Sequence, residues 1–279
     1  MIIDFHTHVF PDEVRADREG FLEREAWFGS LYADPKRKLA SAEDVVASME
    51  EAGVDRTVVL GFPWRDGGLC KEHNSYLLDA VRRYPEKLIG FGIVQPLDAG
   101  DAKELDRCLS GGLMGMGEIG PDSQRYDLEA KWVLADSVEV LLHHDRPLLT
   151  HSSEPLGHDY TGKGTVTPPR LLKLASNFPE LKIVLAHWGG GLPFYELMPE
   201  VREALRNVYY DTAASTYLYS FDIFPIAAQL VGSGRILWGT DFPLLSQAKF
   251  LKRVRESGLN EEQLGAVLGG NAARLLRLL

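Results

Sequence analysis

The chain has 279 residues, 45% of them hydrophobic, which is enough for a large core. Its 30 basic and 40 acidic residues give a formal charge of −10, which argues against a broad nucleic-acid or anionic-membrane surface but is compatible with a local basic pocket. Cys70 and Cys108 lack the close spacing of a zinc knuckle or disulfide framework. With no apolar run near ~20 residues and no secretory signal, we expect a cytoplasmic protein that does not enter membranes.

Short apolar runs alternate with amphipathic stretches along the whole chain. The runs begin near Ile2, Arg56, Leu88, Leu113, Pro147, Lys182, Val208 and Arg235. After the first interval, their starts lie roughly 25–35 residues apart, the length of one strand–helix unit. Helices are predicted between them at residues 41–53, 128–144, 169–177, 193–205 and 221–231. No linker interrupts the alternation, so we predict an α/β fold in which residues 1–279 form a single-domain (β/α)8 TIM barrel.

Two long stretches, residues 9–40 and 152–168, follow predicted strands and are expected to be irregular. Loops of this length are uncommon and are often functional. Because they follow strands, they lie at the carboxyl face of the predicted barrel, where barrel enzymes build their sites.

Polar side chains stand at the ends of five predicted strands. Successive side chains of a strand point to opposite faces, so His6 and His8 share one face at the end of the first strand. The other candidates follow the fourth, fifth, sixth and eighth strands, and they are Glu118, His151, His187 and Asp241. In a barrel these strand ends lie on one rim. Removing these carboxylates and imidazoles together from water would cost free energy unless a bound cation compensated for it. We therefore predict that they bind a divalent metal.

Imidazole nitrogen combined with carboxylate oxygen is typical of a Zn²⁺ site, with Mn²⁺, Fe²⁺ or Ni²⁺ as alternatives. One or two metals per chain are compatible with the sequence. In the two-metal arrangement, the two strand-one histidines and Asp241 hold one ion, Glu118 ligates or bridges, and His151 and His187 hold the other. In the one-metal arrangement, His151 joins the first ion and His187 orients the substrate.

Five motifs resemble those of the amidohydrolase-related branch of the amidohydrolase superfamily, namely residues 6–11 (HTHVFP), 187–190 (HWGG), 210–212 (YDT), 238–243 (WGTDFP) and 270–276 (GNAARLL). By this resemblance, the superfamily's metal-site positions correspond to His6, His8, His151, His187 and Asp241. The resemblance spans the chain and is specific for the superfamily, but much less specific for a reaction.

One motif departs from the branch. Residues 117–122 (GEIGPD) resemble a segment of TatD-type metal-dependent hydrolases, in which the glutamate bridges or ligates two metals. Many members of the branch, including aminocarboxymuconate-semialdehyde and resorcylate decarboxylases, hold one metal without a strand-four carboxylate. Glu118 therefore favours hydrolysis.

Our main prediction is accordingly a metal-dependent hydrolase that uses a metal-activated water on a small-molecule lactone, amide or ester. Asp241 and His187 are the predicted catalytic residues, with Asp241 moving the proton between water and leaving group. The alternatives are a metal-dependent non-oxidative decarboxylase of a small carboxylic acid, a TatD-like phosphodiesterase or nuclease, and a barrel in which the metal is only structural.

Substrate contacts are predicted from residues that follow the strands. The candidates are Trp64, Arg65, Arg125, His158, Tyr160 and Trp188. Arg65 or Arg125 could hold an anionic group of the substrate bidentately. His73, His143 and His144 are placed outside the site. The expected partner is a small molecule, nucleic acid is disfavoured, and a homo-oligomer is compatible with the exposed barrel helices.

Overall fold

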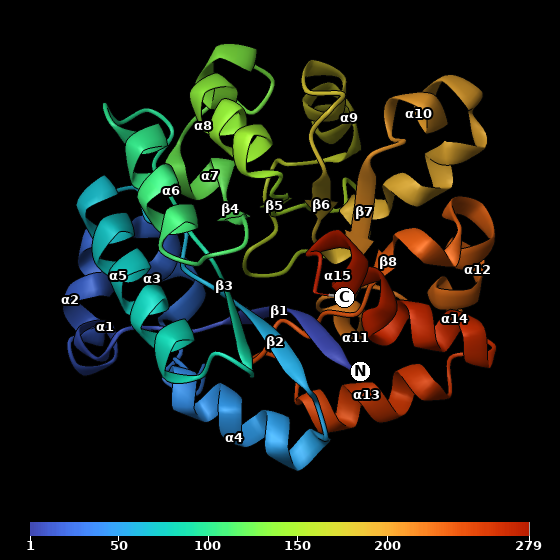
Figure 1. Ribbon diagram of the computed structural model, residues 1–279, viewed down its shortest axis with the longest axis horizontal. Helices are drawn as coiled ribbons and strands as arrows, with labels where there is room; N and C mark the ends of the chain where they lie inside the picture. Colours follow the sequence, from blue (N-terminus) through green and yellow to red (C-terminus); the bar gives the residue numbers. More distant parts are fainter. Residues whose placement is uncertain (279) are drawn as a thin grey trace.

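The computed structural model describes residues 1–278 and contains two parallel sheets that share one ring (Figure 1). The first sheet has the order β1 (Ile3–His8), β2 (Arg56–Leu60) and β3 (Leu88–Phe91). The second has the order β4 (Met116–Ile119), β5 (Leu148–Thr150), β6 (Ile183–Leu185), β7 (Val208–Asp211) and β8 (Ile236–Leu237). Strand order follows chain order in both sheets, as in a barrel built from successive strand–helix units.

Backbone contacts join the two sheets at both seams. Parallel bridges pair Gly92 with Met116 and Thr7 with Phe242. At the second seam, the amide of Asp241 donates to the carbonyl of His6 at 2.8 Å. The ring of eight parallel strands is therefore closed, which confirms the predicted α/β barrel.

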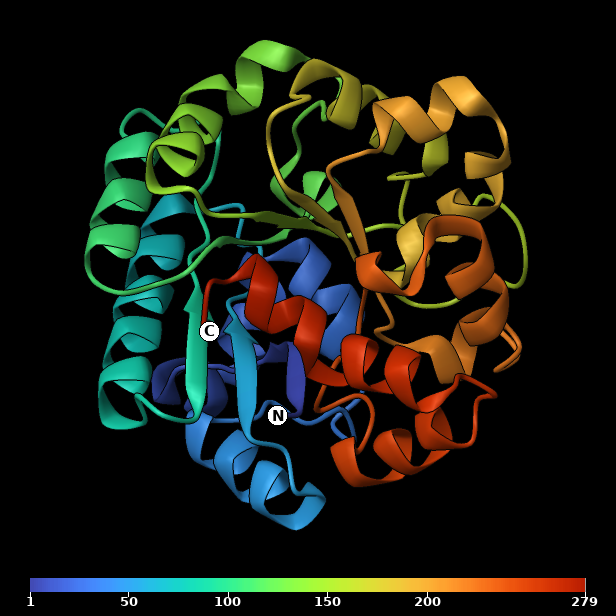
Figure 2. The ribbon, with the colours of Figure 1, turned by 45° about the vertical axis from the view of Figure 1, so that its right-hand side comes forward.

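Helices surround the ring (Figure 2). The longer ones are α4 (Ala42–Ala52), α5 (Gly67–Arg83), α6 (Asp101–Ser110), α8 (Lys131–His144), α9 (Pro168–Asn177), α12 (Ile223–Val231) and α13 (Gln247–Arg255). The shorter ones are α7 (Pro121–Gln124), α10 (Pro199–Ala204), α11 (Ser215–Leu218), α14 (Glu261–Gly265) and α15 (Asn271–Leu275). A capping box formed by Ser41 and Asp44 starts α4, and Gly53 ends that helix in a left-handed conformation, in agreement with the helix predicted at residues 41–53. None of the helices within residues 1–278 has both the length and the apolar character needed to cross a membrane.

Two local predictions were wrong. Residues 9–40 are not irregular, because they form the short helices α1 (Asp12–Ala16), α2 (Arg18–Arg24) and α3 (Ala26–Tyr32). These helices bury Phe21 and Phe28 against Trp64, which supplies an apolar core that short polar loops lack. The continuous helix predicted over residues 193–205 is instead a 3-10 segment, His187–Leu197, followed by α10.

Hydrophobic side chains form a layer inside the ring and another between strands and helices. The inner layer combines side chains such as Phe5 and Phe91 with Ala272, Leu275 and neighbouring residues of the C-terminal region. Helix α15 lies across the middle of the ring in Figures 1 and 2. It closes the end where the strands begin, since Arg146, just before β5, donates to the carbonyl of Leu276. The site must therefore lie at the other end.

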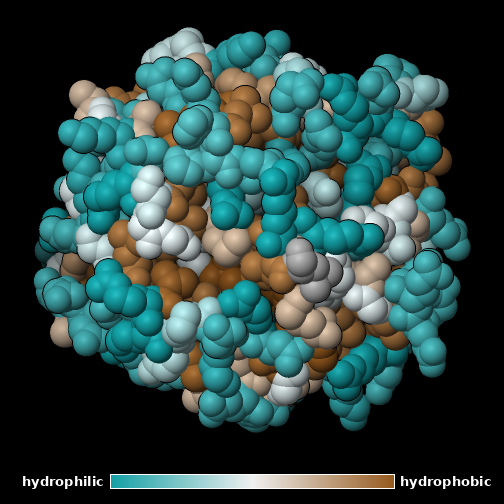
Figure 3. Space-filling model, in the orientation of Figure 1, coloured by the Kyte–Doolittle hydropathy of each residue, from teal (hydrophilic) through white to brown (hydrophobic). Residues whose placement is uncertain are grey.

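The face seen in Figure 1 is largely hydrophilic in space-filling view (Figure 3). Hydrophobic residues show mainly in the hollow between the surrounding helices. This pattern is the one expected for amphipathic helices that pack their apolar sides onto the barrel.

Strand β1 contains an extra residue between Asp4 and Thr7, the stretch that includes the predicted ligand His6. Asp4 lies beside Thr57 of β2, but Thr7 lies beside Val59, so three steps along β1 match two along β2. A bulge of this kind changes which side chains face inward. It allows Phe5 to pack in the inner layer while the next residue, His6, also faces the interior above it.

Candidate metal centre

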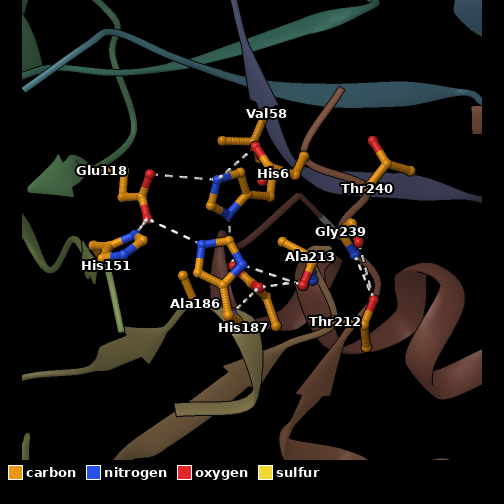
Figure 4. A network of polar contacts seen from close by, with 12 residues as sticks. His6, Val58, Glu118, His151, Ala186, His187, Thr212, Ala213, Gly239 and Thr240 are labelled. Atoms are coloured by element: carbon orange, nitrogen blue, oxygen red, sulfur yellow. Dashed lines mark hydrogen bonds and ion pairs between the residues drawn. The ribbon is translucent and has the colours of Figure 1, made fainter. Parts of the chain in front are cut away.

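Six polar residues predicted from the strand ends meet at the carboxyl rim of the barrel. They are His6, His8, Glu118, His151, His187 and Asp241. Figure 4 shows the Glu118 carboxylate with His6 on one side and His151 and His187 on the other. The Nε2 atoms of His6 and His8 lie 3.1 Å apart, which confirms that the two side chains converge.

Two groups of side chains in the cluster have the spacing of a metal site. One is His6, His8 and Asp241, and the other is His6, Glu118 and His187, with the ligand atoms of each group within 4.8 Å of one another. Asp241 Oδ1 lies 3.5 Å from His8 Nε2, and Glu118 Oε2 lies 3.3 Å from the same atom. Nitrogen and carboxylate donors at such distances suit a divalent cation after small adjustments of the side chains.

The charges of the cluster are strongly coupled. Burial alone would lower the pKa of His6, but Asp211 and Glu118 outweigh burial and raise it well above its ordinary value. Burial would raise the pKa of Glu118, but the charge of His6 and hydrogen bonds from His151 and His187 hold it well below its ordinary range. Burial also opposes the shift at His187, where the bond to Glu118 raises the pKa to about 9. A cation bound here would replace these protons, so its binding releases protons.

Asp211, at the end of β7, orients two of the histidines. Its Oδ2 accepts a hydrogen bond from Nδ1 of His6 at 2.8 Å, which leaves the lone pair of Nε2 facing the cluster. Its Oδ1 accepts the backbone amides of His187 and Ala213, both at 3.0 Å. Nδ1 of His187 donates to the carbonyl of Ala213 at 3.2 Å, so its Nε2 also faces the cluster.

We predict that Asp211→Asn weakens metal binding about 10-fold to 100-fold, because the substitution disturbs the orientation of a ligand. The two backbone amides keep the amide oxygen in the place of Oδ1, so the NH₂ group faces Nδ1 of His6. That contact favours the tautomer with a proton on Nε2, where the metal would bind. Competition with a chelator measures the change, and Asp101→Asn, outside the cluster, is the matched control. An affinity within threefold of wild type would contradict this role of Asp211.

A second buried carboxylate, Asp4 in β1, joins the first strand of the barrel to the segment that follows the last strand, β8. It accepts hydrogen bonds from the hydroxyl of Thr240 at 2.6 Å and from Gln247 at 2.8 Å. Its backbone partners are the amides of His6 and Thr240. Burial raises the pKa of Asp4 to about 6 despite these bonds. The network holds the β1 bulge beside the turn that carries Asp241.

The HWGG motif brings the chain close to the loop after β5. His187, Trp188, Gly189 and Gly190 all have positive φ, between 54° and 60°. A Cβ on Gly190 would lie 2.3 Å from the carbonyl oxygen of Ser153. Glycine is therefore required here for close packing of the backbone beside the metal centre.

His151 belongs to the cluster but to neither ligand group. Its Nδ1 lies 3.0 Å from Glu118, and its Nε2 donates to the carbonyl of Gly162 at 3.2 Å. The described residues therefore do not form a preassembled site in which His151 and His187 would hold a second ion. Moreover, the carboxylates of both ligand groups approach the same atom, Nε2 of His6, at 3.5 Å for Glu118 and 3.8 Å for Asp241, and its single lone pair serves one ion at a time.

A cavity of about 580 Å³ opens above the cluster. His8, Glu118, His151, His187 and Asp241 contribute to its floor. His158 and Tyr160, two of the predicted substrate contacts, line its wall. Asp122 and Tyr217 also line it.

Four predicted substrate contacts do not reach the cavity. Trp64 and Trp188 are buried in the core, where the indole N–H groups donate to His73 and Ser215 respectively. Arg65 and Arg125 also lie outside the cavity lining, although the residues just before them, Phe62 and Pro63 after β2 and residues 120–123 after β4, belong to it. These four predictions are corrected, since position after a strand does not set the direction of a side chain.

The structure adds residues that the sequence alone did not reveal. Trp27, Tyr32 and residues 36–38 come from the segment between β1 and β2 and line the cavity. The basic run Lys36-Arg37-Lys38 was the available signal for part of this group. Asp211 also had a signal, because it ends a predicted strand as the metal ligands do.

The histidines excluded from the site lie elsewhere. His73 is buried between Trp64 and the carbonyl of Val9, and burial lowers its pKa to about 4. His73 is therefore neutral, and its hydrogen bonds hold the segment after β1 next to the segment after β2. His144, at the end of α8, contacts Asp106 on α6.

Comparison with known proteins now identifies the family. The family model described as amidohydrolase matches residues 3–278, almost the whole chain. The chain belongs to this amidohydrolase family. It is therefore a metal-dependent enzyme of the amidohydrolase superfamily, as the motifs predicted.

Several of the relatives found by sequence and by structure are decarboxylases, and others are named only as amidohydrolases. Gamma-resorcylate decarboxylase of a Polaromonas species is 23% identical, with 99% of this chain and 98% of that protein aligned. The structure of 5-carboxyvanillate decarboxylase from Sphingomonas paucimobilis is 20% identical, has a TM-score of 0.83, and covers 99% of this chain and 98% of its own. The enzyme from Novosphingobium aromaticivorans, solved with manganese and a hydroxy-methoxy-nitrobenzoic acid, is 19% identical with a TM-score of 0.80 over 99% and 96% of the chains.

The predicted hydrolysis of a lactone, amide or ester was wrong. The full-length similarity to decarboxylases supports the alternative reaction instead. The error came from Glu118, which was taken as the bridge of a two-metal hydrolytic centre. In the structure Glu118 contacts histidines of both ligand groups, so its presence does not specify a second metal.

Proposed function

We propose that this chain is a metal-dependent non-oxidative decarboxylase of an aromatic carboxylic acid. The observation that carries the proposal is the similarity to decarboxylases over 99% of the chain, combined with a metal-type ligand cluster at the floor of a cavity. The cavity volume of about 580 Å³ is in the range of small-molecule sites.

The ligand set fits one divalent cation. His6, His8 and Asp241 would hold it, with Glu118 and His187 close enough to complete the coordination. Manganese is the first candidate because solved relatives contain it, and zinc is compatible with the same donors. A cation here would bind oxygen atoms of the substrate and stabilise the negative charge that develops on them.

The chain's own residues supply orientation and the proton. Asp241, whose carboxylate borders both the ligand histidines and the cavity, gives a proton to the ring carbon that carries the carboxylate. The bond between that carbon and the carboxylate then breaks, its electron pair returns to the ring, and carbon dioxide leaves. His187, fixed by Ala213, presents Nε2 to the substrate side of the cluster. Trp27 and Tyr32 provide aromatic surface for the ring.

Purified protein loaded with manganese tests the proposal. We expect it to bind close to one equivalent of metal per chain and to release carbon dioxide from at least one acid in a panel of hydroxybenzoates. Removal of the metal with a chelator should abolish release, and added manganese should restore it.

Esters, lactones and amides serve as controls in the same assay. Two equivalents of metal and hydrolysis of these compounds, without decarboxylation of any acid, would refute the proposed function. Metal analysis by mass spectrometry and detection of product by chromatography give the two readouts separately.

A further inference from the structure

One side of the cavity is lined by hydrophobic side chains. They come from α11 and from the turn after β8, and they are Tyr217, Leu218, Pro243 and Leu244. Of the described lining residues that follow β7 and β8, Asp241 is the only charged one. We call residues 217, 218, 243 and 244 the apolar patch.

The side of the cavity across the ring is polar. Strands follow chain order around the closed ring, so β4 lies opposite β8. The lining that follows β4 and β5 includes Asp122, His158 and Thr161. Because the metal centre lies on the floor between the two sides, a molecule that fills the cavity meets polar groups on one side and hydrocarbon on the other.

Much of the apolar patch is exposed to solvent. Tyr217 is 55% exposed and Leu244 is 48% exposed. Contiguous hydrophobic side chains at a surface mark binding sites more often than scattered ones do. Covering them releases free energy roughly in proportion to the apolar area removed from water. A hydrocarbon group of the ligand is therefore the chemical match for this side of the cavity.

Hydrogen bonds hold the apolar patch beside the metal centre. The amide of Leu244 donates to the carbonyl of Asp241 at 2.7 Å, so the turn that carries the proposed proton donor also fixes Leu244. Ser215, at the start of α11, donates its hydroxyl to the carbonyl of Thr212 at 2.6 Å and accepts the indole N–H of the buried Trp188 at 2.7 Å. A ligand group can thus contact the patch without first ordering the backbone.

The cavity is larger than a simple hydroxybenzoate. Its volume of about 580 Å³ is the share of roughly 20 water molecules in the liquid, at about 30 Å³ each. A hydroxybenzoate has about ten non-hydrogen atoms, none of which needs more room than a water molecule. Such a ligand would leave about half of the cavity unfilled. Space therefore remains for a substituent that reaches the apolar patch.

We propose that the substrate is an aromatic acid that carries an alkyl side chain longer than methyl, which the apolar patch binds while the carboxylate lies at the metal centre. This inference rests on the proposed function. Because Leu244 is held to Asp241, the proposed proton donor to the ring, we place the alkyl group on the ring carbon next to the one that carries the carboxylate. A hydroxybenzoate without this group would leave the patch in contact with water.

A matched pair of compounds tests the apolar patch. Both are hydroxybenzoates, and the carbon next to the carboxylate-bearing one carries propyl in the first and methoxymethyl in the second. The two groups have the same shape, but the ether oxygen must give up its hydration to enter an apolar site. For the manganese-loaded wild type, we expect kcat/KM to be about 10-fold higher for the propyl compound. A methyl compound should also be about 10-fold poorer than the propyl compound, at roughly threefold per methylene group.

Leu244→Asn should lower the preference for propyl over methoxymethyl about fivefold, because a polar side chain of similar size replaces hydrocarbon. Leu142→Asn is the matched control, since Leu142 on α8 is 46% exposed, much as Leu244 is, but lies outside the cavity lining. Each preference is a ratio within one protein, so a general loss of activity leaves it unchanged. Calorimetric binding of both compounds to the manganese-loaded protein gives a readout that does not depend on turnover.

The outcomes separate this inference from the proposed function. Decarboxylation without a preference for propyl, or with a preference that Leu244→Asn leaves unchanged, would overturn the role of the apolar patch but not the proposed function. If neither compound is decarboxylated but the propyl compound binds more tightly in a Leu244-dependent way, the patch binds the alkyl group and the proposed reaction for these compounds fails. Equal or undetectable binding of the two compounds refutes the role of the patch in either case.

Light scattering tests the competing occupant of the apolar patch, a second copy of this chain. If Leu244→Asn separates subunits and leaves the preference for propyl intact, the second copy covers the patch and the inference is wrong. We expect the variant to keep the oligomeric state of the wild type and to lose the preference.

Discussion

Asp241→Asn is expected to lower kcat/KM about 1000-fold while the protein stays folded. The loss follows from removal of the group that we propose as proton donor, an effect of roughly 10²–10⁴-fold for general acid–base residues. The fold should tolerate the change because Asp241 has φ of 65°, a conformation that asparagine adopts readily. The backbone bonds of Asp241 to His6 and Leu244 do not involve its side chain.

Asp145→Asn is the matched control for this variant. Asp145 also has a positive φ, 50°, and it lies at the end of α8, where its side chain contacts Lys182. We expect that variant to keep wild-type activity. Steady-state kinetics and far-UV circular dichroism compare the two proteins. If Asp241→Asn retained more than a tenth of wild-type kcat/KM, Asp241 would not be the proton donor.

Glu196→Ala is expected to cost about 3–5 kcal/mol of unfolding free energy, because one partner of a buried ion pair is removed. Glu196 is 1% exposed and accepts a hydrogen bond from the hydroxyl of Tyr210 at 2.6 Å. It also pairs with the guanidinium of Arg235 just before β8. The substitution would leave both donors without their acceptor in the outer core.

Urea unfolding gives the measurement for Glu196→Ala, with Glu203→Ala as control. Glu203 pairs with Arg206 on the surface, where such pairs contribute ~1 kcal/mol or less. Glu196→Gln should fall between wild type and Glu196→Ala, because an amide can still accept from Tyr210 but lacks the charge. A loss below 1 kcal/mol for Glu196→Ala would show that the pair contributes little to stability.

The barrel and the convergence of polar strand ends could be predicted because both depend on a regular repeat. Parallel strands bring their carboxyl ends to one rim, so His6, His187 and Asp241 could be placed together without knowing any loop. The same rule applied to Asp211 would have found the residue that orients His6. The β1 bulge was not predictable, because the alternation of side chains in β1 looks regular in the sequence.

Loop residues were predicted less well because their directions depend on tertiary packing. Trp64 and Trp188 follow strands as the ligands do, yet both rings turn into the core. Conversely, Tyr32 and Arg37 are far from any strand end but line the cavity, because short helices fold the segment after β1 over the rim. The choice of reaction failed for a related reason. The interpretation of Glu118 used only its carboxylate chemistry and its position at the end of the fourth strand. The number of ions that the cluster can hold depends instead on which histidines Glu118 contacts.

The buried bonds between Asp4 and Thr240 join residues 236 positions apart. During synthesis on the ribosome, His6 and His8 are made early. Asp241 can approach them only after β8 has been made and has joined the barrel. A nascent chain that stops before β8 already has His6, Glu118 and His187, yet its ring lacks the last strand and the bonds that hold the first. We therefore expect the proposed ligand set to acquire metal late, only after the barrel has closed.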